Sequence, residues 1–523
     1  MRLFFMNVRQ ARVLLAQIGA ALVVATFLGG CGDNYRPVVT PINSSGPPAQ
    51  PTSYVIVVST TGATTPGIVT IVDYSGDSIL NETPIGPGPG VFTIDEIASS
   101  GYTINSDGTL SNFALSTSLQ AKYVSESTLP KTAQPVNLMA PSSGLWAPDL
   151  TGDVVDLFSG SPQAYKLSIP LATATSPATM PVMVTGSPTL TGEREYVISQ
   201  NVPDAAAALQ TEAVTCNNPS NFAAAPTGVA VPIEISSNTA DPAIPVGKCP
   251  VYAIESPDQQ RFFVLNRGDD TITVINARNN TLDACTPFQN QNGQTVNCHP
   301  TLPLSLNAVA ATGIKPPNGT AGMTATAGPV YAEYNQATEQ LVVANYDGGT
   351  ISVIDTSLDE YGNDSSTFGT TYTIPVGNTA TPNPASVTVL YDGSKAYTAN
   401  QNDGAENGTV TVVNLSTHTV EKTITVVGHP RTIASTQNSE YSKIYTASPD
   451  SPFVTIIQSS PTVTDLVDTT VLVEGTVVDL RVTTVNGSSG NPNFWSRVPG
   501  YGQPCNLPGA AQYASLAQCQ ATP

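Results

Sequence analysis

The three histidines, His299, His418 and His429, are the side chains best suited to acid–base or metal chemistry in this chain of 523 residues, and they lie far apart in the sequence. The motifs Gly-x-Ser-x-Gly, Gly-x-x-x-x-Gly-Lys-Ser/Thr, His-Glu-x-x-His and Cys-x-x-Cys-His are absent. His418 follows Ser416 and Thr417, and we expect it to be solvated in a turn. Residues distant in sequence can still form a site, so catalysis is disfavoured and no catalytic residue is assigned.

Polar residues that follow short apolar segments are the better candidates for a binding surface. The candidates are Arg267, Asp269, Asn345, Tyr346, Asp347, Asp403, His429 and Arg431. Asn, Asp and Gly also supply the backbone conformations of tight turns, so a structural role competes with a binding role at those positions. Arg267, His429 and Arg431 are not turn formers, and a solvated polar rim is the competing explanation for them.

One acidic loop is a candidate calcium site. Loop Gln401–Gly408 carries Asp403 and Glu406, and carboxylates with backbone carbonyls are ligands that Ca²⁺ prefers. The spacing Asp-x-Asp-x-Asp-Gly with a closing Glu is missing, so no cofactor is predicted and calcium stays an alternative.

The elements that must position these residues are short β-strands. A unit recurs between 244 and 484. Its first copy opens with Ile244–Pro250, which contains a Val-Gly-x-x-Pro segment, and the apolar segment Val251–Ile254. It continues with Arg261–Asn266, a turn, and then Thr271–Asn276. β-Branched and aromatic segments bounded by Gly, Asp, Asn or Pro predict strands joined by hairpins. Four strands per unit, at about 40–50 residues per repeat, are typical of a propeller blade.

The repeat resembles the YVTN family of β-propeller repeats. The match is best at Ala396–Asn400, Val412–Asn414 and Ile424–Pro430. Degenerate copies upstream open at Tyr54–Ser59, Tyr102–Asn105, Leu145–Asp149 and Glu195–Ser199, which makes eight units, although seven is commonest in the family. The resemblance implies an all-β propeller of seven or eight four-stranded blades over 54–484.

The two ends of the repeat predict how the ring closes. The first unit opens at Tyr54–Ser59 without an innermost strand, and an extra apolar strand, Val477–Thr483, follows the last unit. We expect the extra strand to complete the first blade, which leaves few exposed strand edges. Two smaller sheet domains are the alternative. In a four-strand meander, the turn after the second strand and the connection to the next blade lie on one face, where the candidate residues would gather.

The N-terminal segment predicts export. Basic residues precede the apolar run Val13–Leu28, and Leu28–Cys31 closely resembles a bacterial lipobox, in which the Cys is acylated after cleavage. We therefore expect residues 1–30 to be a signal peptide and 31–53 a Pro- and Ser-rich tether from Cys31. By resemblance to Gram-negative lipoproteins, Gly32 in place of Asp favours the outer membrane.

The remaining six cysteines predict disulfides, because their number is even and the compartment is oxidising. Short loops favour Cys285–Cys298 and Cys505–Cys519, which leaves Cys216–Cys249. The last pair lies in a predicted C-terminal tail, 485–523. Zinc is the competing interpretation, but closely spaced Cys pairs are missing.

The amino-acid composition limits the kinds of partner that the protein can bind. Only 11% of residues are charged and the formal net charge is −20, without a run of Lys or Arg, which disfavours nucleic acid. We expect contact with a membrane through the lipid anchor only. The sequence favours an envelope-anchored, non-catalytic binding scaffold for a protein, glycan or peptide. The alternatives are a lactonase-like or quinone- or haem-linked propeller enzyme and an envelope structural protein. The sequence does not fix the oligomeric state.

Overall fold

The computed structural model describes residues 54–483, with interruptions at 96–97, 116–120, 142–143, 174–176, 187–193, 202–215, 217–218, 291–292, 305–325, 437–441 and 460–464. Contacts divide the chain into Met1–Gln50 and Pro51–Pro523, and the described residues all belong to the second unit. The predicted signal peptide, Cys31, the tether and the tail 485–523 lie outside the described residues.

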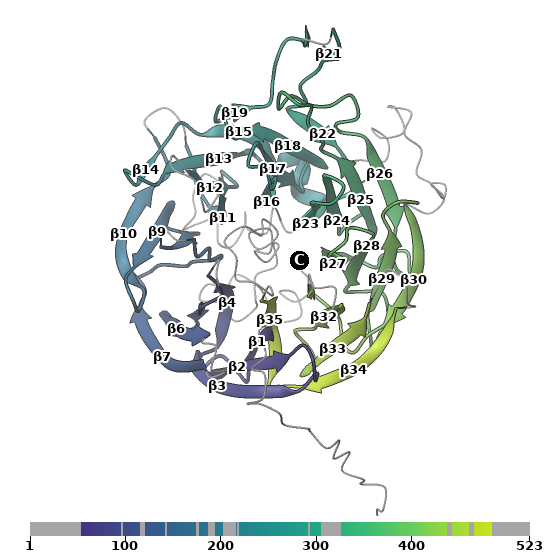
Figure 1. Cartoon of the computed structure of the whole chain (residues 1–523). Helices are drawn as coiled ribbons and strands as arrows, with labels where there is room; N and C mark the ends of the chain where they lie inside the picture. Colours follow the sequence, from purple (N-terminus) through teal and green to yellow (C-terminus); the bar gives the residue numbers. More distant parts are fainter. Residues whose placement is uncertain are drawn as a thin grey trace, which may run out of the picture. The chain divides into compact units, whose positions relative to one another are not determined.

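The described residues form eight antiparallel sheets around a common axis, as Figure 1 shows. The fold is therefore an all-β propeller, as the sequence predicts, and the count of seven or eight blades resolves to eight. One short 3-10 helix, η1 (Pro219–Ala224), accompanies the strands. It lies within the segment that joins the second and third strands of blade 4.

The first four blades follow the chain from Tyr54. Blade 1 contains β1 (Tyr54–Thr60), β2 (Pro66–Asp73) and β3 (Ile79–Pro87), together with the C-terminal β35 (Thr476–Val482). Blade 2 contains β4 (Pro89–Ile94), β5 (Ser100–Asn105), β6 (Thr109–Leu115) and β7 (Ala121–Thr128). Blade 3 contains β8 (Leu145–Asp149), β9 (Val154–Ser159) and β10 (Ala164–Pro170), with isolated bridges from Pro135 and Met139 beside β8. Blade 4 contains β11 (Pro181–Gly186), β12 (Arg194–Ser199), β13 (Thr227–Glu234), β14 (Thr239–Ala240) and β15 (Ile244–Lys248).

The last four blades carry the clearest repeats. Blade 5 contains β16 (Pro250–Glu255), β17 (Arg261–Asn266), β18 (Thr271–Asn276), β19 (Thr281–Leu282) and β22 (Thr301–Pro303), with the hairpin β20 (Phe288–Gln289) and β21 (Thr295–Val296) inserted. Blade 6 contains β23 (Pro329–Asn335), β24 (Gln340–Asn345), β25 (Thr350–Asp355) and β26 (Thr371–Pro375). Blade 7 contains β27 (Pro384–Val389), β28 (Lys395–Asn400), β29 (Thr409–Asn414) and β30 (Thr419–Thr425). Blade 8 contains β31 (Thr432–Ser435), β32 (Lys443–Ala447), β33 (Phe453–Gln458) and β34 (Leu466–Leu472).

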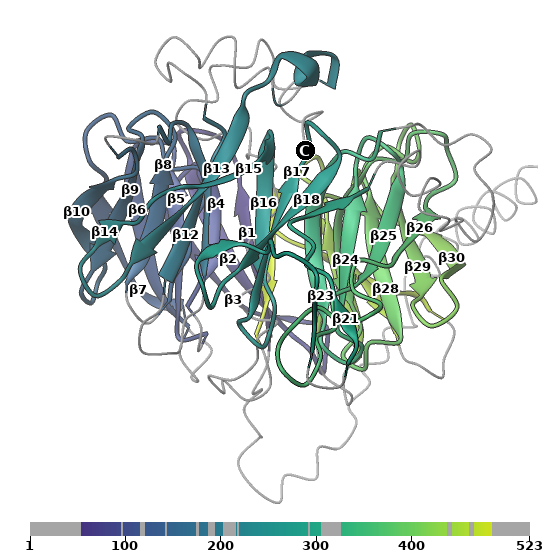
Figure 2. The same ribbon diagram turned by 90° about the horizontal axis from the view of Figure 1, so that it is seen from above.

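Two faces of the ring are distinguished by their loops. The upper face carries the turns between second and third strands and the connections between blades. The lower face carries the other two turns of each blade. Figure 2 shows the strands side-on, with the short teal helix η1 beyond their upper ends.

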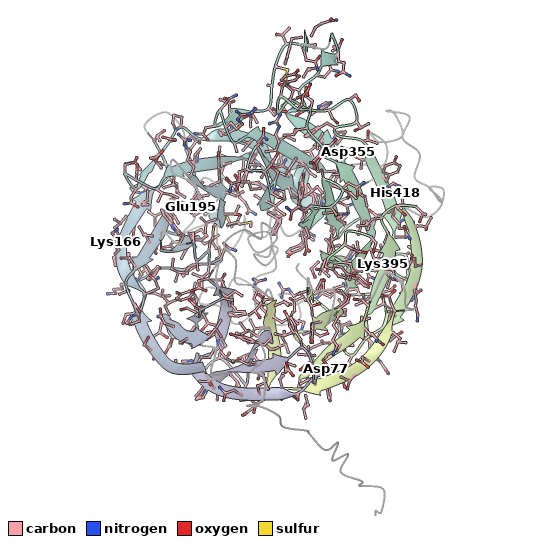
Figure 3. The ribbon with its side chains drawn as sticks, viewed as in Figure 1. Asp77, Lys166, Glu195, Asp355, Lys395 and His418 are labelled. Carbon is pink, nitrogen blue, oxygen red and sulfur yellow. A yellow bond between two sulfur atoms is a disulfide. The ribbon has the colours of Figure 1, made fainter. Side chains whose placement is uncertain are left out.

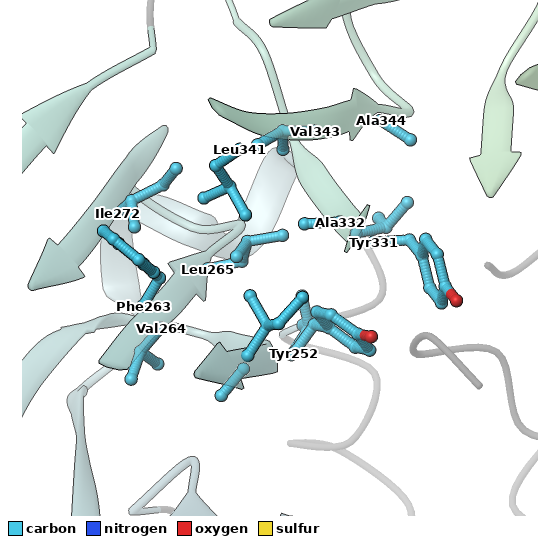
Figure 4. Close-up of a cluster of buried hydrophobic side chains, with 14 of the residues drawn as sticks. Tyr252, Phe263, Val264, Leu265, Ile272, Tyr331, Ala332, Leu341, Val343 and Ala344 are labelled. Carbon is cyan, nitrogen blue, oxygen red and sulfur yellow. The ribbon is translucent and has the colours of Figure 1, made fainter. Parts of the chain in front are cut away.

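The core lies between blades rather than within one sheet. Second strands such as β17 and β24 are buried along almost their whole length, because each sheet packs against a neighbour on both sides. This burial explains why their sequences are continuous apolar runs instead of strict alternations. Figure 4 shows part of this core, where Phe263 and Leu265 from blade 5 lie near Leu341 and Val343 from blade 6.

The ring closes through the C-terminal strand. β35 pairs antiparallel with β1, with Val57 opposite Leu480, and the sheet order is β3-β2-β1-β35. Tyr54 N donates to Thr483 Oγ1 over 2.8 Å, and Thr483 N donates to Tyr54 O over 2.9 Å. The predicted completion of the first blade by Val477–Thr483 is thus confirmed.

Polar contacts near the lower face join consecutive blades. Lys395, the first residue of β28, donates to Asp465 Oδ2 of blade 8 over 2.7 Å, and Tyr397 donates to Asp465 Oδ1 over 2.7 Å. Lys443, the first residue of β32, repeats this with Asp77 Oδ2 of blade 1 over 2.6 Å. The second contact therefore spans the closure of the ring (Figure 3 labels Lys395 and Asp77). Because these ions are largely buried, removing one partner would leave an uncompensated charge.

Two of the three expected disulfides lie in the described residues, and both are confirmed. Cys216 bonds to Cys249, and Cys285 bonds to Cys298. Cys505 and Cys519 lie outside the described residues. Disulfides of this kind indicate an oxidising compartment and so an exported protein. The zinc interpretation is wrong for the four described cysteines, since their sulfur atoms are joined in pairs. No helix of the described residues is long and apolar enough to cross a membrane.

One expectation about histidine is wrong. His418 lies in the turn between β29 and β30, as predicted, but its ring stacks on Tyr372 of blade 6 with centroids 3.7 Å apart and an interplanar angle of 8°. Burial lowers the pKa of His418. The neutral ring packs between blades 6 and 7 instead of being fully solvated. Because this contact joins two blades, the sequence of one strand could not predict it.

Candidate functional site

The turns and connections that carry the candidate residues meet on the upper face. Asp269, in the turn after β17, accepts from Lys248 N over 3.0 Å, and Lys248 lies in the connection that enters the same blade. Asp403 likewise accepts from Asn378 N and Thr379 N over 2.7 Å. In blades 5 and 7 the turn after the second strand is therefore hydrogen-bonded to the segment that leads into the blade.

Asn345 belongs to a repeated structural device. Its Nδ2 donates to Thr350 Oγ1 over 3.0 Å and to Ser352 Oγ over 2.9 Å on the neighbouring strand. Asn400 makes the same pair of bonds to Thr409 and Thr411 of blade 7. The side chain of Asn345 is fully buried. This Asn closes the end of the second strand and is not directed at a ligand.

A glycine in the connection into blade 7 makes room for the turn. Gly377 has φ +73°, and a Cβ there would lie 2.4 Å from Pro382 Cβ and 2.9 Å from Asp403 Cγ. Its N–H donates to Thr411 Oγ1 over 2.9 Å. Only a residue without a side chain fits this approach, which gives the glycine of the Val376-Gly377 pair a physical basis.

Blade 6 departs from this arrangement. Asp347 occupies the same turn as Asp269 and Asp403, but its carboxylate accepts from Arg267 Nε over 2.9 Å and from Nη2 over 2.8 Å. The entering connection is held instead by Asp270, whose Oδ1 accepts from Ala327 N and Gly328 N over 3.0 and 2.8 Å. Asp347 thus forms a bidentate ion pair with the preceding blade, the geometry that guanidinium and carboxylate groups favour.

Arg267 is enclosed by aromatic rings. Its guanidinium carbon lies 5.6 Å from the centroid of Phe222 and 5.5 Å from that of Tyr346, both within range of a cation–π contact. The side chain is only 2% exposed. Arg267 is therefore a buried anchor of the upper face and not part of a solvated rim.

A disulfide fixes one of those rings. Cys249 directly precedes β16 and bonds to Cys216, and the two cysteines pack with Phe222. Lys248 Nζ also donates to Ala223 O over 2.8 Å. The segment around η1 is therefore fastened to the blade that carries Arg267.

The Tyr346 side chain is the centre of the cluster. Asn402 Nδ2 donates to its hydroxyl over 3.4 Å, and Asn383 Nδ2 donates to its backbone carbonyl over 3.0 Å. Burial raises the pKa of Tyr346, while the charges of Arg267 and Arg431 oppose that rise. Two guanidinium groups, from blades 5 and 8, therefore act on one phenol. Asn402 itself is exposed.

His429 forms a separate pair. It lies in the connection into blade 8, where its Nδ1 contacts Asp450 Oδ2 and its N–H donates to Asp450 Oδ1 over 3.0 Å. Among the residues with described positions, no group of three or more His, Cys, Asp or Glu side chains is placed to hold a metal. Asp403 also accepts from Thr409 Oγ1 over 2.6 Å. Calcium at this loop stays an untested alternative.

Tyrosines on two inner strands form a second polar group, near the axis. The rings of Tyr252 and Tyr331 lie 4.8 Å apart, and Figure 4 shows their hydroxyls on the same side. Burial raises the pKa of Tyr252 well above its usual value, Tyr331 and Glu333 add to that rise, and Arg481 opposes it. Arg481 belongs to β35 of blade 1, so its charge acts across the axis on blade 5.

The eight candidate residues are thus only partly gathered. Arg267, Tyr346 and Asp347 contact one another, and Arg431 lies within electrostatic reach. Asp269, Asp403 and His429 pair within their own blades. Reasoning from the sequence did not identify Phe222 or the Tyr252–Tyr331 pair. The pair could have been found, because the same sequence, Pro-Val-Tyr-Ala, opens both β16 and β23.

The fold is a β-propeller, and the loops of its upper face carry polar residues. The comparisons with known proteins agree with this fold. No family model and no curated protein matches the chain. Among solved structures, dihydro-haem d1 dehydrogenase NirN is similar over 84% of this chain and 76% of its own, with 12% identity and a TM-score of 0.52. AztD of Citrobacter koseri has 10% identity, covers 82% of this chain and 97% of its own, and has a TM-score of 0.49. The periplasmic gluconolactonase PpgL of Pseudomonas aeruginosa has 13% identity, covers 83% and 99%, and has a TM-score of 0.44. Similarity at this level shows the propeller fold alone.

Proposed function

We propose that this chain is an exported lipoprotein whose YVTN-like propeller binds a ligand on its upper face without transforming it. The observation that carries the proposal is the cluster of Arg267, Tyr346 and Asp347, with Arg431 close to the same phenol. The chain has only 19 Lys and Arg residues, so two guanidinium groups around one tyrosine are a marked concentration of positive charge.

The cluster has the properties of a preorganised recognition surface. Arg267 and Asp347 hold each other in a bidentate pair, and the disulfide at Cys249 fastens the neighbouring segment, so little ordering is required on binding. Exposed Asn402 and half-buried Arg431 supply hydrogen-bond donors at its edge. Arg267 and Tyr346, which are 2% and 4% exposed, lie beneath this edge and hold it in place. A protein, peptide or glycan of the envelope is the expected ligand.

Anchoring through Cys31 leaves this surface accessible. β1 begins at Tyr54, opposite Asp73 at the end of β2, and therefore starts at the lower face. A chain anchored at Cys31 would therefore reach the ring from that side and leave the described residues of the upper face free to meet a ligand. An outer-membrane location, as Gly32 favours, would place the ring in the periplasm or at the cell surface.

Acylation has a direct test. Replacing Cys31→Ser should release the protein from membranes into the aqueous fraction, because the thiol that carries the lipid is lost. Membrane fractionation with and without detergent measures this. Extraction that still requires detergent would show that Cys31 is not the anchor.

Ligand binding is tested by capture from envelope extract with the mature chain that carries Cys31→Ser. A ligand of the upper face should be retained by this chain and lost from its Asn402→Ala/Arg431→Ala variant. Lys166→Ala, on β10 at the outer edge of blade 3, is the matched control and should retain it. A ligand that all three chains retain does not bind at this face and contradicts the proposal.

The same captured ligand separates binding from catalysis. A scaffold returns it chemically unchanged, whereas the enzymatic alternative requires turnover. The observation that keeps this alternative open is the buried Tyr252–Tyr331 pair beside Glu333 and opposite Arg481. Mass spectrometry of the ligand before and after incubation would detect turnover, and Tyr252→Phe should abolish it if the axis is the active site.

A further inference from the structure

Exposed apolar side chains gather on the lower face, where β1 enters the ring. Eight large apolar residues of the described chain are exposed. Five lie in lower turns or at the lower ends of outer strands, each in a different blade, and the sixth belongs to the hairpin inserted in blade 5. These six are Ile79, Tyr165, Phe288, Tyr361, Val420 and Leu466. The other two, Val427 and Leu472, lie at the upper ends of outer strands. All three exposed aromatic residues are in the first group.

One of these aromatics lies on a projecting hairpin and a second lies in the turn that the hairpin contacts. Phe288 belongs to the hairpin β20–β21, which extends outward from blade 5 in Figure 1, and it is 42% exposed. Tyr361 is 41% exposed and lies in the lower turn of blade 6. Asn290 Nδ2 donates to Asp359 Oδ2 over 3.4 Å, which joins the hairpin to that turn.

The hairpin is held firmly at its base. The Cys285–Cys298 disulfide closes it. His299 Nδ1 contacts Asp364 Oδ2 over 2.7 Å, and the same carboxylate accepts from Arg261 Nη2 over 2.8 Å. Asp364 has no exposed side-chain surface, so this contact is a buried anchor between blades 5 and 6. The hairpin takes no part in closing the ring. Ring closure therefore does not explain why the hairpin is anchored so firmly.

We propose that the lower face rests on a lipid surface, with Phe288 and Tyr361 as its interfacial anchors. This inference builds on the proposed acylation of Cys31. By the scaling of about 5–6 Å × √n, the 23-residue tether 31–53 would have a root-mean-square length on the order of 25 Å, which would hold the lower face near the bilayer on average. A tethered surface meets its partner at a high effective concentration, so weak apolar contacts suffice. Aromatic rings with a polar edge favour the headgroup region of a bilayer.

Charge on this face selects the kind of lipid. Asp359 lies in the same turn as Tyr361, and its carboxylate accepts from Tyr361 N and Asn363 N, each over 2.9 Å. Burial raises the pKa of Asp359, and these hydrogen bonds lower it. The effect of the hydrogen bonds is larger, so the pKa of Asp359 is lowered and its carboxyl group is charged at neutral pH. Glu360 adds a second carboxylate. Anionic headgroups would be repelled, so the structure fits a zwitterionic surface.

The test measures partition of the mature chain with Cys31→Ser onto vesicles of phosphatidylcholine and phosphatidylethanolamine. The variant Phe288→Ser/Tyr361→Ser should lower the partition coefficient about tenfold, since each ring loses part of the transfer free energy of an aromatic side chain. The control Val427→Ser/Leu472→Ser, on the upper face, should partition like the unchanged chain. Replacing half of the phosphatidylethanolamine by phosphatidylglycerol should weaken binding.

Each outcome decides one point. No partition of the Cys31→Ser chain, or an equal loss in both double variants, overturns the lower-face inference. Stronger binding to phosphatidylglycerol overturns the zwitterionic preference. Thermal melting verifies that each variant folds, and both pairs of positions are exposed. If vesicle binding holds but cellular Cys31→Ser does not change extraction, the anchor fails and not the surface. The Asn402→Ala/Arg431→Ala variant should keep vesicle binding, which separates this result from ligand binding.

Discussion

Asp156 gives the sharpest prediction about stability, because a carboxyl group is buried there with little compensation. It lies on β9 with 1% of its surface exposed. Ser168 Oγ donates to its Oδ1 over 2.5 Å, and within the described residues its Oδ2 has no hydrogen-bond partner. Burial raises the pKa of Asp156 to about 6, with Ser168 opposing and Asp149 adding to the rise.

The sign of the pH dependence follows from that shift. An unfolded Asp titrates near pH 3.8, so between about pH 4 and 6 the native state holds a proton that the unfolded state has lost. The free energy of unfolding therefore falls as pH rises through this window and is constant above it. A shift of about two units corresponds to about 3 kcal/mol at neutral pH.

Asp156→Asn should remove this loss. The variant should be more stable than the wild type by as much as about 3 kcal/mol at pH 7.5 and similar to it at pH 4, because only the charged form is unfavourable. Urea unfolding at pH 4, 5, 6 and 7.5 measures the difference. Asp149→Asn is the matched control on the neighbouring strand. It should be destabilised, because Asp149 Oδ1 accepts from Gln134 N over 2.9 Å and from Thr151 N over 3.2 Å, and these bonds weaken when the acceptor loses its charge. Parallel pH curves for wild type and Asp156→Asn would refute the reasoning.

Three further substitutions or deletions test the repeat, the cluster and the closure. Val343→Thr should raise the free energy of unfolding in urea by about 1 kcal/mol. The new hydroxyl can donate to Asn345 Oδ1, which is buried and without a partner among the described residues. An unchanged urea midpoint would contradict this. Arg267→Met should cost about 3 kcal/mol in thermal unfolding, since it leaves the Asp347 carboxylate without its cation, whereas a loss no larger than that of an exposed pair would show that the contact is weak. Deleting 477–523 should abolish the single cooperative transition seen by circular dichroism, whereas deleting only 485–523 should preserve it; loss in both or in neither would reject closure by β35.

The architecture could be predicted because its determinants are local. Each second strand is a short run of β-branched and aromatic residues bounded by turn formers, and all eight openings from Tyr54–Ser59 to Ile444–Ser448 correspond to second strands. Closure could also be predicted, since the first unit lacked a strand and the last had one in excess. These features need no knowledge of which blades touch.

The candidate site could be predicted only in part because its contacts are between blades. Asp269, Asp347 and Asp403 occupy the same kind of turn, and nothing near Asp347 distinguishes it. The difference arises from Arg267, 80 residues earlier, whose guanidinium reaches across to it. Phe222 reaches the cluster through a disulfide. One signal was available, because Lys395 and Lys443 open their strands two residues before a Tyr, and both bind an aspartate of the next blade.

The two faces of the ring divide the work of the proposed protein. On the lower face, Lys443 and Asp77 lock the closure and β1 begins, and the proposed lipid contact would use the exposed aromatics. On the upper face, Arg267 and Asp347 stiffen the polar surface that we propose binds a ligand. If the ring is held at its lower face and binds its ligand at its upper face, substitutions on one face should leave binding at the other face unaffected. Vesicle partition and ligand capture should therefore vary independently, and a variant of Phe288 that lost the ligand would show that the faces are coupled.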